Sequence, residues 1–65
     1  MNIERALRLK KGDKVHYPED MGRPGSIAEV VQDPNPSSSS RTINDVEFIW
    51  VNLGQFGLWP SNRLS

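Results

Sequence analysis

Two stretches of the chain alternate hydrophobic and polar residues with a period of two, which is typical of strands that bury one face. The segment KVHY places Val15 and Tyr17 on one face, and the segment SIAEVV places Ala28 and Val30 on one face. Gly and Pro residues, which favour turns, flank both segments. The sequence therefore predicts a strand in each segment and a loop at 18–25 between them.

The strongest strand signal is the segment VEFIWV, because it is a run of β-branched and aromatic residues. Val46, Phe48 and Trp50 lie on one face of this strand, and Ile49 and Val51 lie on the other. The face of Ile49 and Val51 is too apolar to remain in open water. The pattern does not decide what covers this face. The candidates are an N-terminal helix, another strand after a sharp bend, and another subunit.

Helical spacing occurs only at the start of the chain. Ile3, Ala6 and Leu7 follow the i, i+3, i+4 pattern of a helix face, which predicts a helix of about seven or eight residues. A helix this short persists only if it packs against the rest of the protein. Leu7 and Leu9 also alternate, so an extended segment is the competing interpretation.

The remaining segments are turns and loops. Residues 32–45 are polar, with two Pro and four consecutive Ser residues, and they predict a long, flexible hairpin loop. Gly54 and Gly57 predict a turn that uses positive φ angles. The PSN segment predicts a tight turn in which Ser61 and Asn62 bond to their own backbone, and RLS predicts a last short strand.

Length and composition narrow the choice of protein class. The chain has 65 residues, enough for a single domain over 1–65, and four or five short strands without a long helix indicate an all-β small barrel. It contains no Cys and one His, which predicts neither disulfides nor a zinc site and fits a cytoplasmic location. Eight basic residues balance eight acidic ones, and no apolar run is long enough for a membrane span.

The last strand and its turn resemble the end of a Src-homology-3 (SH3) domain. In that family a Gly, two apolar residues, Pro-Ser-Asn, an aromatic residue and a Val close the barrel. The segments GDKV and PGSIAEVV are similar to the opening of many SH3-like barrels, including KOW-type modules and the type II dihydrofolate reductases. The resemblance covers most of 10–65 and implies an SH3-like barrel of about five antiparallel strands. The residues that fill the closing pattern are Gly57, Leu58, Trp59, Pro60, Ser61, Asn62 and Leu64.

The resemblance to peptide-binding SH3 domains is incomplete at the positions that grip proline-rich ligands. Pro60 and Asn62 match groove positions of the family, but Arg63 stands where the family has an aromatic residue. The family's Ala-Leu-Tyr-Asp-Tyr motif is missing, and Asp45 and Val46 stand where its paired tryptophans are expected. The sequence therefore argues against proline-rich peptides as ligands.

The resemblance to the type II reductases fails at two functional positions. In these enzymes a Gln-Ile-Tyr stretch lines a pore shared by four subunits, and it corresponds to Gly57, Leu58 and Trp59 here. Gly57 lacks the side chain that makes the key polar contact, and Tyr17 lies near the position of an expected Lys. We therefore expect no enzymatic activity, with an oligomeric pore enzyme as the alternative.

Taken together, these patterns predict a small non-catalytic binding module without cofactor or metal. A protein or peptide is the expected partner. The alternative is nucleic acid, whose bases would stack on aromatic residues while Arg23, Arg41 and Arg63 contact its phosphates. The chain could also form homo-oligomers. The same aromatic residues are expected to build much of the core, Phe48 and Trp50 above all, while Trp59 could be core or surface. The candidate ligand-binding residues are Tyr17, Trp50, Phe56, Trp59, Asn62 and Arg63.

Overall fold

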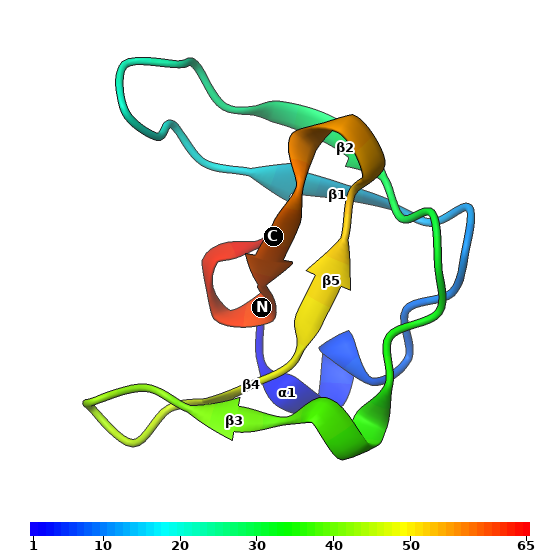
Figure 1. Ribbon diagram of the computed structural model, residues 1–65, viewed down its shortest axis with the longest axis vertical. Coiled ribbons are helices and arrows are strands. Elements are labelled where there is room, and N and C mark those ends of the chain that lie inside the picture. Colours follow the sequence, from blue (N-terminus) through cyan, green and yellow to red (C-terminus); the bar gives the residue numbers. More distant parts are fainter.

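The computed structural model describes residues 1–65 and consists mainly of short antiparallel strands (Figure 1). Six strands form three two-stranded sheets, accompanied by one short α-helix and three turns of 3-10 helix. No helix is long and apolar enough to cross a membrane. In chain order the elements are α1 Ile3–Ala6, β1 Lys14–Tyr17, β2 Ser26–Glu29, η1 Pro36–Ser38, β3 Ser40–Arg41, β4 Glu47–Phe48, β5 Trp50–Asn52, η2 Gly54–Phe56, β6 Leu58–Pro60 and η3 Ser61–Arg63.

Each sheet is a hairpin of consecutive strands, β1 with β2, β3 with β4, and β5 with β6. Isolated backbone hydrogen bonds link the hairpins: the Val31 N–H donates to the Asn52 carbonyl at 3.1 Å, and His16 exchanges two bonds, of 2.8 and 2.9 Å, with Ser65. The end of the chain forms these two bonds in place of the predicted last strand. The protein is therefore a small β-rich domain whose sheets are not closed into a barrel.

The core lies between the hairpins and the N-terminal segment, and it is aliphatic. The alternation predicted for β1 and β2 is confirmed, because Val15, Ala28 and Val30 are buried while Ile27 is exposed. Of the aromatic residues predicted to build much of the core, only Phe48 is buried, whereas Tyr17 and Trp59 are partly buried and pack against the core cluster. The core cluster consists of Ala6, Leu9, Val15, Ala28, Val30, Ile49, Val51, Leu53 and Leu64.

The predicted strand VEFIWV is interrupted at Ile49, which separates β4 from β5. At this point Ile49 pairs with η3: its N–H donates to the Ser61 Oγ at 3.0 Å, and its carbonyl accepts from the Ser61 N–H at 2.9 Å. Ser61 is fully buried, so this pairing satisfies a polar side chain inside the core. The sequence predicts that the Ser61 hydroxyl bonds to its own backbone. In the structure it instead accepts a hydrogen bond from the Ile49 N–H.

The face of Ile49 and Val51 is covered within the chain. Both residues are completely buried and belong to the same cluster as Ala6 of α1. Helix α1 is shorter than predicted, with four residues, and its N-terminus is capped by Asn2, whose Oδ1 accepts from the Arg5 N–H at 2.8 Å. The helix and its neighbouring strands therefore provide the cover that the sequence pattern required.

Residues 32–45 contain more secondary structure than the sequence predicted. Asn35 caps η1, because its Oδ1 accepts hydrogen bonds from the Ser37 N–H at 3.0 Å and from the Ser37 hydroxyl at 2.7 Å. The serine run continues into β3, which pairs with β4. The predicted loop thus contains a helical turn and one strand of a hairpin, both formed by local polar bonding.

Candidate functional site

The loop between β1 and β2 covers residues 18–25, and its tip is a tight turn at Met21 and Gly22. Asp20 and Arg23 exchange two backbone hydrogen bonds, of 2.9 and 3.0 Å, on either side of this turn. Met21 has a φ of 49° and Gly22 a φ of 81°, which are the left-handed angles of a two-residue hairpin turn. Such angles are uncommon for methionine, and the Met21 side chain is 95% exposed. The turn therefore holds a large apolar side chain out in solvent.

Gly25 fixes the base of the same loop through a close approach of two backbone segments. A Cβ atom at this position would lie 2.4 Å from the Tyr17 carbonyl oxygen and 2.9 Å from the Pro18 carbonyl carbon. Both contacts are shorter than van der Waals packing allows. Only glycine therefore permits the loop to fold back against the end of β1.

Replacing Gly25 by alanine should destabilise the protein, because backbone atoms have to move to admit the new methyl group. We expect a loss of about 1–3 kcal/mol in the free energy of unfolding and a Tm lower by roughly 5–20 °C. Thermal unfolding followed by circular dichroism measures this effect. Ser26→Ala, at the adjacent exposed position, is the control. An unchanged Tm for Gly25→Ala would show that the loop does not pack as described.

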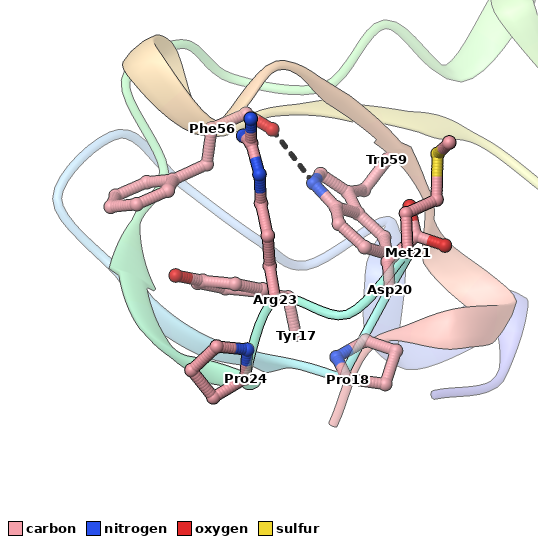
Figure 2. Close-up of a pocket in the computed structure, with 8 residues that line it drawn as sticks. All are labelled: Tyr17, Pro18, Asp20, Met21, Arg23, Pro24, Phe56 and Trp59. Carbon is pink, nitrogen blue, oxygen red and sulfur yellow. Dashed lines mark hydrogen bonds between the residues drawn. The ribbon is translucent and has the colours of Figure 1, made fainter.

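Three aromatic side chains meet beside this loop, although they come from distant parts of the chain (Figure 2). Tyr17 lies at the end of β1, Phe56 in η2 and Trp59 in β6. The ring centroid of Tyr17 is 5.1 Å from that of Phe56 and 5.6 Å from that of Trp59, and both ring pairs are tilted. The Trp59 indole N–H donates to the Phe56 carbonyl at 2.8 Å, which fixes the orientation of the indole.

The loop and the aromatic residues line a cavity that is open to solvent. Its volume of about 500 Å³ is within the range of ligand-binding clefts. Half of its lining residues are hydrophobic, and two others, Asp20 and Arg23, carry charged side chains. In Figure 2 the Arg23 side chain passes between Phe56 and Trp59, while Asp20 lies on the other side of Trp59. The lining residues are Tyr17, Pro18, Asp20, Met21, Arg23, Pro24, Phe56 and Trp59.

Neither Arg63 nor Asn62 lines this cavity. The Arg63 guanidinium carbon lies 5.2 Å from the centroid of the Trp59 ring, within the range of a cation–π contact. Asn62 is half-buried, and its Oδ1 atom is buried without a hydrogen-bond partner. Arg63 thus adds a positive charge beside the aromatic cluster, whereas Asn62 contributes no side chain to the cavity.

Trp50 lies apart from the other candidate residues. Its ring contacts Phe48 edge to face, with centroids 5.3 Å apart, and it borders a second hollow of about 150 Å³ together with Asn52 and Leu58. Trp50 is 44% exposed, so the prediction that it belongs to the core is wrong. Phe48 is buried as predicted, although it does not belong to the core cluster.

Of the six candidates, the structure brings together Tyr17, Phe56 and Trp59 and places Arg63 against Trp59. Arg23, considered in the sequence as a phosphate ligand, also lines the cavity. Arg41 does not: it pairs with Asp45 at 3.2 Å in the β3–β4 hairpin.

The loop residues that form the opposite wall of the cavity were not among the residues predicted from the sequence. Pro18, Asp20, Met21 and Pro24 are all in the segment PEDMGRPG, for which the sequence predicts only a loop. The Met-Gly pair between Asp20 and Arg23 was a usable signal, because Gly at the second position favours a hairpin turn that would bring the loop back over Tyr17.

The titratable side chains that line the cavity are those of Tyr17, Asp20 and Arg23. Nowhere in the structure do three or more His, Cys, Asp or Glu residues gather in a way that could hold a metal ion. Comparison with models of known families, with curated proteins and with solved structures found no match for the chain. The cavity combines aromatic and other apolar side chains with one carboxylate and one guanidinium.

Proposed function

We propose that the protein is a small binding module that holds a short peptide segment of a partner protein against Tyr17, Phe56 and Trp59. The observation that supports this proposal most directly is the convergence of these residues on an open cavity of about 500 Å³. Aromatic residues in a preformed hollow are the usual anchors of protein interfaces. The loop 18–25 supplies the second wall, which makes the site a groove rather than a flat surface.

We also propose that the three hairpins form an open variant of an SH3-like barrel. Two features support this arrangement. The PSN segment begins the 3-10 turn η3, and directly after this turn the chain returns to β1, where Ser65 pairs with His16. The groove would then lie between the loop after the first strand and the segment that precedes η3.

The cavity favours binding over catalysis. Its charged side chains are one carboxylate and one guanidinium, and no Ser, His, Cys or Lys lines it. The alternative of a reductase-like pore would need Leu58 and Trp59 to line one shared surface. Leu58 instead borders the hollow of Trp50, whereas Trp59 borders the larger cavity.

Peptide binding at this site can be tested with fluorotryptophan NMR, because the chain has two tryptophans. Random short peptides displayed on phage are first panned against the intact protein, and a selected peptide is then titrated into the labelled protein. The resonance of Trp59 should shift, while that of Trp50 should stay in place as the internal control. Failure to select any peptide, or a shift confined to Trp50, would contradict the proposal.

Single-stranded nucleic acid is the second candidate, because Arg23 and Arg63 lie beside aromatic rings on which bases could stack. Two observations favour the peptide. The rings of the cluster already contact one another, and the Asp20 carboxylate places a negative charge in the cavity, which is unfavourable for phosphate groups. Titration with oligothymidylate at low and high salt decides between them, because phosphate contacts make affinity fall steeply with salt.

A further inference from the structure

The two charged residues of the cavity lie opposite each other, but their side chains do not form an ion pair. Asp20 and Arg23 lie directly opposite each other in the antiparallel bridge that closes the turn. Side chains at such positions emerge on the same face and, when oppositely charged, commonly pair. The only ion pair in the protein is between Arg41 and Asp45, so neither Asp20 nor Arg23 has a charged partner.

The side chains of this pair diverge within the site. In Figure 2 the guanidinium of Arg23 lies at the Phe56 end of the cavity, and the carboxylate of Asp20 lies beyond Trp59 beside Met21. The cavity thus has a positive end and a negative end with an aromatic surface between them. The backbone bonds between Asp20 and Arg23 hold the stems of both side chains in this arrangement.

We propose that the groove recognises a peptide in which an acidic and a basic residue lie on opposite sides of an apolar residue. This inference rests on the proposed function. The apolar side chain packs on Tyr17 and Trp59, an acidic side chain pairs with Arg23, and a basic side chain pairs with Asp20. A peptide bound in reverse would bring like charges together at both ends, which is unfavourable. The pair therefore determines the direction in which the peptide lies.

A double variant that exchanges the two charges tests this inference. Asp20→Arg combined with Arg23→Asp keeps the composition and net charge, and both positions are exposed, so folding should be unaffected. Displayed random peptides are panned in parallel against the wild-type protein and this variant. The wild-type protein should select acidic and basic residues in one order around an apolar residue, and the variant should select the reverse order.

The affinity of individual peptides gives a second readout. A peptide selected by the wild-type protein should bind the double variant about tenfold more weakly, because two exposed ion pairs become two repulsions. Equal Tm values for the two proteins are the control for folding. If both proteins select peptides without a charge order, or with the same order, the inference is wrong while the binding function stands. If neither protein selects any peptide, the proposed function itself is wrong.

Discussion

Ile49→Ala should leave a large fraction of the protein unfolded at room temperature. Ile49 is completely buried in the aliphatic core, and removing its side chain is expected to cost about 2–5 kcal/mol. A domain of this size without disulfides or metals rarely exceeds about 3–5 kcal/mol of stability. The cost of the cavity is thus comparable to the whole stability of the fold. Far-UV circular dichroism and urea titration measure the folded fraction.

The matched control for this variant is Ile27→Ala in β2. The same atoms are removed, but Ile27 is 61% exposed, so we expect a change within about 0.5 kcal/mol. A cooperative urea transition for Ile49→Ala at the wild-type midpoint would contradict the central position of Ile49 in the core. Loss of structure in both variants would indicate that the outer face of β2 is buried against something else.

Trp59→Ala should lower both stability and ligand binding. The indole packs against the core, contacts Tyr17 and bonds to the Phe56 carbonyl, so its removal is expected to cost about 2–3 kcal/mol. It also removes the central anchor of the groove, which should weaken a selected peptide by at least about thirtyfold. Denaturant titration gives the first quantity, and fluorescence anisotropy of a labelled peptide gives the second at a temperature where the variant is folded.

Trp50→Ala provides the comparison for Trp59→Ala, because the chemical change is the same and the residue lies in the partner strand β5. Trp50 borders the second hollow, so its loss should leave the affinity for a peptide in the groove unchanged. Stability should fall by about 1 kcal/mol, since the side chain is partly exposed. Equal loss of peptide binding in both variants would place the ligand on a different surface.

The strands of the fold could largely be predicted from alternation, whereas their boundaries could not. Val15, Ala28 and Val30 repeat with a period of two, and the structure buries all three. The break at Ile49 has no such local signal, because the segment VEFIWV is a continuous run of strand-forming residues. It depends on Ser61, which lies in another part of the chain and takes over the backbone bonds of Ile49.

The aromatic residues of the site could be predicted from the sequence, whereas the wall formed by the loop 18–25 could not. Tyr17, Phe56 and Trp59 could be singled out by type, but Trp50 is of the same type and lies elsewhere. Alternation puts Phe48 and Trp50 on one face of VEFIWV and so predicts that both are buried, but only Phe48 is, and Trp50 is 44% exposed. The wall formed by 18–25 depends on a left-handed Met21, which residue preferences disfavour.

The isolated hydrogen bonds between the hairpins have a consequence for how the affinity of the groove can be tuned. One wall of the groove belongs to the β1–β2 hairpin and the other to the β5–β6 hairpin, and no continuous sheet joins them across the opening. The spacing of the walls is therefore set by these few hydrogen bonds and by the aliphatic side chains packed between the hairpins. Under the proposed function, conservative changes in volume at Val30 or Val51, neither of which lines the cavity, should change the width of the groove and with it the peptides that bind.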